Sequence, residues 1–498
     1  MKIFKGDIES FLFVDGMDPD TLVYVLPIMT GFCVEADIRT ICIYKTKLTE
    51  IPGFTQIQNR FRNQVSIVNI KRSNIFKSLI FDGGNRLRMM VRVLEVLKDC
   101  LGIDREDLLN PYGWKMSSRR QAYRHGIWDC LYKKYGRKSD SFGVSQRLSV
   151  FNVFARTLFR SCLLGSVACK AAFLGHNVYH MRLLADRVVE EEKPLVLIAA
   201  FALQVVPTRF SPPPPLLTKQ TFERLSLATT EVEARNFWVK RFESTQANMD
   251  GDLYQLSLAE SRATKSFPTD MVVLFLPVFC DSPFGWLDSE RPFADYYSWI
   301  IETVRWSEET NTRVLLRFHP SHQVWGENSY EILLRMCPTL SKSKNVLIDW
   351  EQKFSHSDIL KFARQIVTFK GTVHMEAVAS GFKPIVLSEC MMSYHFPDSV
   401  LKPKTLHEYR DLLGKKRFAV TNELSIEAMK ILFFKEKFSG LKQNIGAPTL
   451  YRGDSPDKRM AASKVIVEFS LEKQGELMRM GSKLATGQID SLTTLDCV

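Results

Sequence analysis

The chain has 498 residues, too many for one ordinary hydrophobic core, so its length predicts two or more domains. A composition of 45% hydrophobic and 24% charged residues excludes a disordered chain. The net charge of +12 is spread along the sequence, which fits either a solvated surface or attraction to an anionic partner such as a phosphorylated donor or a membrane.

The N-terminal half shows a mixture of strand and helix patterns. We expect strands at 11–15, 40–44, 65–70 and 195–200, and helices at 21–37 and 85–100. Residues 121–185 are predicted to be mostly helical, and 219–244 one long charged helix. The polar stretch 248–266 is the predicted boundary of an N-terminal acceptor-side α/β domain, residues 1–250, with helical insertions.

The following segment alternates short strands and helices. The strands are expected at 271–279, 313–317, 345–348, 365–369 and 384–387, and the helices between them at 293–310, 327–337, 355–363 and 372–380. This rhythm predicts a parallel doubly wound sheet, a Rossmann-like domain over residues 267–440, followed by a C-terminal helical tail over 441–498. Ligands of such sheets bind outside the carboxyl ends of the strands, so polar residues at those ends are the candidates for a site.

Neither a secretory nor a metal-stapled protein is indicated. The ten cysteines form no C-x-x-C pair, so we expect reduced thiols. The N-terminus lacks the apolar core of a signal peptide, and the longest apolar run, 195–206, is too short to span a bilayer. We therefore expect a cytoplasmic protein, and its basic surface is compatible with peripheral contact at the inner face of an anionic membrane. No nucleic-acid-binding motif is present, and nucleic acid is not an expected partner.

Three strand ends carry residues suited to chemistry. The strand ending in Arg317-Phe318-His319-Pro320 holds a histidine at a proline-fixed turn, where it could donate to a phosphate, with Arg317 adding positive charge. In the second, Lys370-Gly371-Thr372 leads into a helix whose free amides could bind phosphate, and Glu376 lies one turn later, where a carboxylate could accept ribose hydroxyls. In each case an ordinary loop or helix cap is the alternative interpretation.

The third candidate is Asp281, which follows the apolar strand that begins the C-terminal domain. Its carboxylate could activate an acceptor or attack a donor carbon, although Asp before Ser-Pro is also good turn chemistry. In the N-terminal half, Asp15 and Asp18 follow the first strand and would face the same cleft if the domains stack face to face. The sequence contains no Walker loop and no G-x-G-x-x-G, H-E-x-x-H or G-x-S-x-G motif.

Together these strand ends resemble the capsule polysaccharide synthesis family of glycosyltransferases, which includes Kdo transferases with a GT-B-like fold. The resemblance covers about 120 residues and rests on three elements in order: an apolar strand leading to an acidic loop (274–282), a strand ending in His-Pro (317–320), and a Gly-Thr-x-x-x-Glu-Ala-x-x-x-Gly-x-x-Pro run (371–384). It implies two Rossmann-like domains facing each other across a cleft.

The resemblance also implies a function. A sugar would move from a nucleotide-sugar donor, with a CMP-sugar such as CMP-Kdo favoured, to a surface polysaccharide or glycolipid acceptor. Arg317, His319, Pro320, Lys370, Gly371, Thr372 and Glu376 would bind the donor, Asp281 and His319 would be catalytic, and Asp15 and Asp18 would lie on the acceptor side. Enzymes of this type stabilise the leaving phosphate with amides and basic groups, so neither a metal nor a cofactor beyond the nucleotide-sugar co-substrate is expected.

Two other functions stay open at this point. A sugar-nucleotide epimerase shares the architecture but needs acid/base carboxylates from both domains, for which Asp15, Asp18 and Asp281 are the candidates. A non-catalytic glycan-binding scaffold could have kept the fold without the chemistry.

Overall fold

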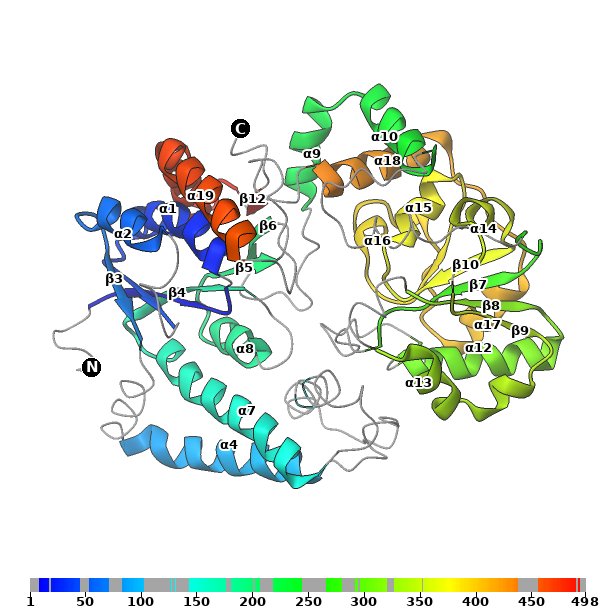
Figure 1. Ribbon diagram of the computed structural model, residues 1–498, viewed down its shortest axis with the longest axis horizontal. Coiled ribbons are helices and arrows are strands. Elements are labelled where there is room, and N and C mark those ends of the chain that lie inside the picture. The colour runs from blue at the N-terminus through cyan, green and yellow to red at the C-terminus, as the bar shows by residue number, and fades with distance from the viewer. Residues whose placement is uncertain are drawn as a thin grey trace.

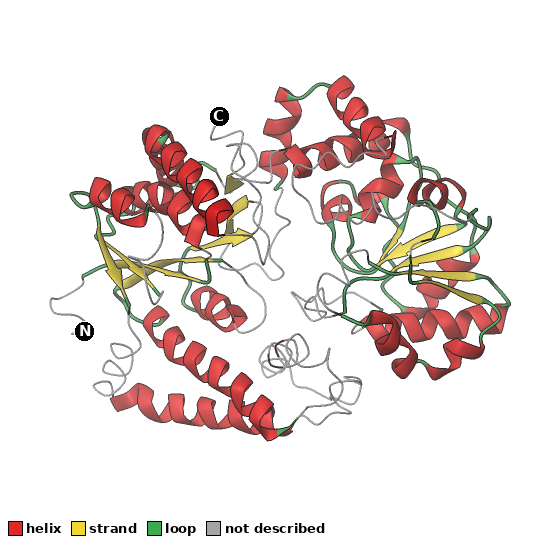
Figure 2. Ribbon diagram, in the orientation of Figure 1, coloured by secondary structure: helices red, strands yellow, loops and turns green. Residues whose placement is uncertain are grey.

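The computed structural model describes residues 9–17, 19–44, 53–70, 83–102, 127, 130, 143–175, 181–199, 202–206, 218–243, 266–279, 292–293, 296–319, 327–351, 353–437, 456–489 and 491–492. Within these ranges the chain forms two α/β domains, each built around one sheet (Figure 1). Figure 2 shows helices on both faces of each sheet, as expected of doubly wound domains.

The first sheet has seven strands in the order β12-β6-β5-β4-β1-β2-β3. Its strands are β1 (Phe11–Asp15), β2 (Thr40–Ile43), β3 (Ser66–Asn69), β4 (Cys169–Leu174), β5 (Leu195–Ala199), β6 (Ala202–Val206) and β12 (Ser491–Leu492). The five from β3 to β5 are parallel, whereas β6 returns antiparallel to β5 and β12 antiparallel to β6. The helices packed around this sheet are α1 (Pro19–Glu35), α2 (Phe54–Phe61), α4 (Gly83–Gly102), α7 (Val144–Leu164), α8 (Arg182–Glu190), α19 (Pro456–Glu472) and α20 (Gln474–Ala485).

The second sheet has five parallel strands in the order β11-β10-β7-β8-β9. These are β7 (Val272–Phe275), β8 (Val314–Arg317), β9 (Val346–Asp349), β10 (Gln365–Thr368) and β11 (Ile385–Val386). The helices of this domain are α9 (Lys219–Ala228), α10 (Glu231–Glu243), α12 (Tyr296–Thr310), α13 (Ser329–Met336), α14 (His356–Phe362), α15 (Val373–Ala379), α16 (Met391–His395), α17 (Leu406–Gly414) and α18 (Asn422–Lys437), with 3-10 turns at Pro338–Lys342 and Pro397–Ser399.

Both sheets follow the same path through their parallel strands. The chain starts in a central strand, winds outward through two neighbours, and then returns to wind outward on the other side. The direction of winding therefore reverses between β1 and β4 in the first sheet and between β7 and β10 in the second. This is the Rossmann arrangement, and it confirms the predicted fold class of two Rossmann-like α/β domains. That the domains face each other across a cleft stays a prediction.

The strands are apolar throughout because helices cover both sides of each sheet. Along β1, Leu12 and Val14 pack with α1, α2 and α20, whereas Phe11 and Phe13 point to the opposite face and pack with α7 and α8. Burial also raises the pKa of the Cys42 thiol, on the neighbouring strand, to about 12, so this thiol stays protonated at neutral pH.

The C-terminal tail returns to the N-terminal domain, where α19 and α20 lie beside α1 (Figure 1). The crossing of α1 and α20 depends on two glycines, one on each helix. A Cβ atom on Gly481 would come within 1.9 Å of the Ile28 carbonyl oxygen, and one on Gly31 within 1.9 Å of the Met478 carbonyl oxygen. The two backbones approach so closely that neither glycine leaves room for a side chain. The tail is thereby fixed to the first sheet, to which it also adds β12.

Other elements differ from the sequence prediction. The segment 219–244 forms two helices, α9 and α10, which pack against α15, α16 and α18 of the C-terminal domain although the sequence boundary placed them in the N-terminal one. The predicted helical region 121–185 contains β4, a central strand of the first sheet. The strand predicted at 195–200 is confirmed as β5, and the sequence did not indicate β6, which pairs antiparallel with it.

Candidate functional site

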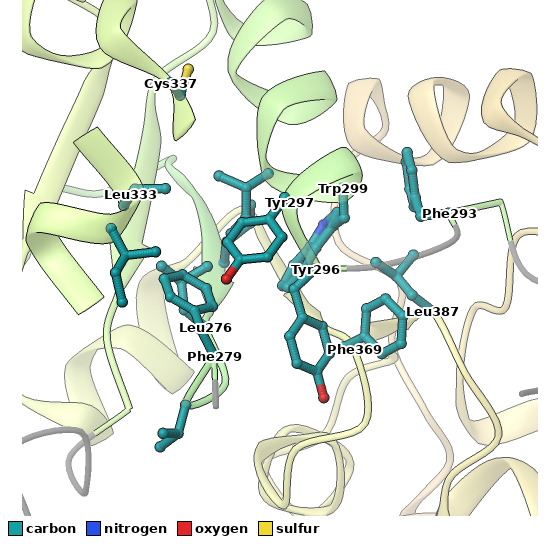
Figure 3. Packing of buried hydrophobic residues seen from close by; sticks show 14 of the residues in the cluster. Leu276, Phe279, Phe293, Tyr296, Tyr297, Trp299, Leu333, Cys337, Phe369 and Leu387 are labelled. Carbon is teal, nitrogen blue, oxygen red and sulfur yellow. The ribbon is translucent and has the colours of Figure 1, made fainter. Parts of the chain in front are cut away.

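The candidate site lies at the carboxyl edge of the second sheet, where the winding reverses between β7 and β10. The loops that follow β7, β8 and β10 meet there, and they hold the described residues of all three sequence motifs. Aromatic side chains of α12 pack against the ends of two of these loops (Figure 3). Tyr297 lies 5.2 Å from Phe279 and Tyr296 lies 4.8 Å from Phe369, measured between ring centroids. The loop ends after β7 and β10 therefore rest on one buried aromatic layer.

The loop after β7 is anchored by a buried carboxylate. The backbone N–H of Phe279 donates a 2.9 Å hydrogen bond to Oε1 of Glu327, which also accepts from the Ser329 hydroxyl. Glu327 is only 3% exposed, so this contact ties the loop to the start of α13. Asp281, two residues beyond Phe279, lies outside the described residues, and its catalytic role stays a prediction.

Arg317, at the end of β8, is a structural residue rather than a free cation. It is 3% exposed, its guanidinium pairs with the buried Asp349 carboxylate, and it donates a 2.9 Å hydrogen bond to the Phe354 carbonyl oxygen. The Asp349 carboxylate balances the charge of Arg317, and the hydrogen bond to Phe354 fixes the loop between β9 and α14. The structure argues against the expectation that Arg317 binds the donor phosphate, because the guanidinium is buried and Asp349 already balances its charge.

His319 lies where the sequence predicted it, at the carboxyl end of β8. It follows β8 by two residues, at the carboxyl edge, and its side chain is half-buried. Pro320 lies outside the described residues. That His319 and Pro320 take part in donor binding or catalysis stays a prediction, which its location at this edge permits.

The loop Lys370-Gly371-Thr372 is held in place by Thr368, the last residue of β10, and by the buried His374. The Gly371 N–H donates to the Thr368 hydroxyl at 3.0 Å, and His374 Nδ1 lies 2.6 Å from the Gly371 carbonyl oxygen. The pKa of His374 is lowered to about 4, mainly by burial and in part by the neighbouring Lys435, while the hydrogen bond to Gly371 and the Glu376 carboxylate oppose the shift. The ring is therefore neutral, with Nδ1–H donating to Gly371.

The other nitrogen of the same ring extends the connection. His374 Nε2 accepts a 3.4 Å hydrogen bond from the backbone N–H of Met392, at the start of α16. One uncharged imidazole thus joins the loop after β10 to the segment after β11. From the sequence His374 had no predicted role, because it is one of the variable positions in the Gly-Thr-x-x-x-Glu motif.

Thr372 has a cationic partner that the sequence did not indicate. Lys435, on α18, donates from Nζ to the Thr372 hydroxyl at 2.8 Å. Lys370 is exposed two residues earlier in the same loop. The two lysines bring positive charge to this loop, which favours an anionic ligand.

Glu376 lies one turn into α15, as its spacing predicted, but it is buried. It is 1% exposed, and its Oε2 lies 2.8 Å from Nε2 of His356 at the start of α14. The His356 ring in turn packs edge-on against Phe275, the last residue of β7, at 5.4 Å. The Glu376 carboxylate is thus part of a polar pair beside the point where β7 and β10 diverge. Its binding of ribose stays a prediction.

On the acceptor side, Asp15 is also a structural residue. The carboxylate is 6% exposed, pairs with the buried Arg160 of α7, and accepts a 2.7 Å hydrogen bond from the Gly16 N–H. Arg160 further donates to Thr157 at 2.6 Å and lies over the Tyr44 ring at 4.7 Å. The Asp15 carboxylate is thus buried and its charge is balanced by Arg160, and the assignment of Asp15 to the acceptor side stays a prediction that this pairing does not favour. Asp18, the other acceptor-side candidate, lies outside the described residues.

Two observations concern metals and membranes. Within the ranges that the structure describes, no group of three or more His, Cys, Asp or Glu side chains is arranged to hold a metal ion. In the same ranges, no helix combines the length and apolarity that crossing a bilayer requires.

A scan against protein-family models and a search of curated proteins each found no match to the sequence. Among solved structures, 86% of the chain aligns with 99% of a UDP-GlcNAc 2-epimerase from Neisseria meningitidis bound to UDP-GlcNAc, at 10% identity and a TM-score of 0.23. A glycosyltransferase from Rickettsia africae aligns over 94% of this chain and 98% of its own, at 9% identity and a TM-score of 0.24. A ugt transferase from Siraitia grosvenorii in complex with UDP aligns over 96% and 99%, at 11% identity and a TM-score of 0.19. TM-scores of this size do not establish a shared arrangement, so the fold assignment rests on the strand orders above.

Proposed function

We propose that the chain is a glycosyltransferase whose C-terminal domain binds a nucleotide-sugar donor at the carboxyl edge of the second sheet. The observation that carries the proposal is the Lys370–Thr372 loop, which lies beside the reversal point of a Rossmann sheet and is contacted by Lys435. Phosphate-bearing ligands of such sheets bind at that point, and basic groups there neutralise them.

The donor chemistry follows from the groups at this edge. His319, Lys370 and Thr372 would hold the donor phosphate, with Gly371 allowing close approach and Pro320 fixing the turn. His374 is a positioning residue that holds the loop through the Gly371 carbonyl. Glu376 would bind the ribose, exchanging or sharing its His356 partner. Arg317 is left out of the set because Asp349 already neutralises it.

The reaction would transfer a sugar from a CMP-sugar such as CMP-Kdo, the donor that the His-Pro element favours. The bond between the anomeric carbon and the phosphate oxygen breaks, a bond from an acceptor hydroxyl to that carbon forms, and CMP leaves. Asp281 would take the hydroxyl proton or attack the anomeric carbon. The basic groups at the edge would stabilise the departing phosphate without a metal.

The acceptor in this proposal is a surface polysaccharide or glycolipid bound by the N-terminal domain. The protein would act in the cytoplasm, at the inner face of the membrane, in peripheral contact with anionic lipid. This position suits a glycolipid acceptor because the lipid would stay in the bilayer while its sugar is extended.

One observation favours transfer over epimerisation. An epimerase of this architecture needs acid/base carboxylates from both domains. Asp15, the described carboxylate proposed for the N-terminal domain, is neutralised by Arg160. Of the two N-terminal carboxylates predicted for this role, Asp18 would then have to supply it.

The test is release of CMP from CMP-Kdo with and without a Kdo-accepting glycan or glycolipid. We expect release only with the acceptor. Turnover without an acceptor, with UDP-GlcNAc converted to its 2-epimer, would favour an epimerase, and no binding or turnover with any nucleotide sugar would favour a scaffold. His319→Ala is expected to abolish turnover, whereas His407→Ala, at a side chain 86% exposed on α17, should leave it unchanged.

A further inference from the structure

The outer helix of the N-terminal domain leaves an apolar stripe uncovered. In Figure 1, α4 lies outside α7, so that α7 separates it from the first sheet. Val91, Leu94 and Leu101 of α4 are 47%, 60% and 39% exposed. Their spacing places them on one side of the helix, together with the exposed Lys98. The buried Val96 and Cys100 lie on the opposite side, so the inner face of α4 is already packed and the stripe is a second apolar face.

The start of α7 continues this surface. Val144 and Leu148 are 61% and 44% exposed, one turn apart on the first two turns of α7. The Arg147 guanidinium donates a 2.7 Å hydrogen bond to the Leu101 carbonyl oxygen, so the end of α4 and the start of α7 lie together. We call these five exposed side chains, Val91, Leu94, Leu101, Val144 and Leu148, the α4–α7 stripe.

The charge of this region identifies the kind of surface that would cover the stripe. Over α4 and α7 the sequence has seven Lys and Arg against two Asp and Glu, a net charge of +5. Exposed aliphatic side chains on helices with basic flanks are typical of helices that lie in the interface of an anionic bilayer. A second copy of the chain would bring two such basic regions together and be repelled.

A comparable apolar surface elsewhere lacks the charge. Leu227 and Val232, on α9 and α10, are 90% and 64% exposed. Residues 219–243 contain five Lys and Arg against four Asp and Glu, so their charge is nearly balanced. This surface has the exposed aliphatic groups of the α4–α7 stripe without the attraction to anionic lipid, and it provides a matched control.

We propose that the α4–α7 stripe is the surface by which the protein docks on an anionic lipid bilayer. Leu94 and Leu101 enter the acyl boundary, and Lys98 between them extends its ammonium group to the lipid headgroups. The inference deepens the membrane contact of the proposed function. It does not require donor binding, so the two proposals fail in different experiments.

The test is co-sedimentation of the full chain with phosphatidylcholine vesicles, with and without about one third phosphatidylglycerol. We expect binding only to the anionic vesicles, weakened by added salt. Leu94→Gln should reduce the partition coefficient about tenfold, because it removes a large exposed apolar side chain from the bound surface. Leu227→Gln should leave it unchanged, and neither variant should alter CMP binding or the unfolding midpoint.

Three results would overturn the proposal. Absence of binding to either vesicle would do so, as would equal binding to neutral and anionic vesicles, or equal losses in Leu94→Gln and Leu227→Gln. Concentration-dependent self-association in analytical ultracentrifugation that Leu94→Gln abolishes, without vesicle binding, would assign the stripe to a second copy of the chain instead. Failure of the wild-type chain to bind CMP would contradict the proposed donor site but would not affect the conclusion from the vesicle experiment.

Discussion

The neutral imidazole of His374 makes the folded protein sensitive to acid in a predictable direction. Its pKa falls from 6.5 to about 4, first because the ring is buried and then because Lys435 lies near it. Between these values the unfolded chain binds a proton at His374 and the folded chain does not. The free energy of unfolding therefore rises with pH across this window, and the contribution of His374 to it is lost on acidification. The difference in pKa corresponds to about 3 kcal/mol.

The perturbation that isolates this contribution is His374→Gln. The amide can still donate to the Gly371 carbonyl oxygen and accept from the Met392 N–H, but it does not titrate. Urea unfolding followed by tryptophan fluorescence, from about pH 7 to about pH 4, would give the free energy for each protein. We expect the wild type to lose about 3 kcal/mol more than the variant over that range.

The control is His407→Gln, whose side chain is 86% exposed and which should follow the wild-type curve. Parallel curves for the wild type and His374→Gln would refute the reasoning, because they would mean that His374 takes up its proton equally in both states. A wild-type curve that gains stability on acidification relative to the variant would reverse the sign and contradict the assignment of a neutral ring.

Further predictions concern packing, an ion pair and the donor loop. Gly481→Ala should cost about 2 kcal/mol or more of unfolding free energy, because its Cβ meets backbone, whereas Gly475→Ala on the same helix, with nothing within 4 Å, should gain about 0.5–1 kcal/mol; equal effects would contradict the close crossing. Asp15→Asn should lower that free energy by about 3–5 kcal/mol, because it leaves a buried guanidinium unpaired, and an unchanged urea midpoint would count against the pair. Lys435→Met should weaken calorimetric CMP binding about tenfold, because it removes the cation that contacts Thr372, while Lys430→Met on the same helix should not change it; equal affinities would exclude Lys435 from the site.

The strands of the C-terminal domain could be predicted closely because each is a short apolar run between turn residues. β8 and β10 begin and end within a residue of the prediction. β4 could not be predicted, because Cys-Lys-Ala-Ala-Phe-Leu contains no β-branched residue and two alanines that favour helix. Its strand conformation comes from pairing with β1 and β5 on either side. β6 was not predicted because no Asn-Gly or Asp-Gly pair between it and β5 signals a hairpin.

The candidate site was predictable in position but not in its partners. Strand ends in a parallel sheet meet at one edge, so the sequence order placed His319, Lys370 and Thr372 correctly at that edge. Partners from distant segments leave no local signal. Lys435 contacts Thr372 although the two are 63 positions apart in the sequence. Asp349, on the neighbouring strand β9, forms the ion pair that balances the charge of Arg317.

The central claim is that the carboxyl edge of the second sheet binds a nucleotide phosphate. Isothermal titration calorimetry of CMP into the wild type, His319→Ala and His407→Ala tests it most directly. We predict saturable binding to the wild type and to His407→Ala, and a loss of at least tenfold in affinity for His319→Ala. Equal affinities for all three proteins, or no binding of CMP to the wild type, would contradict the account.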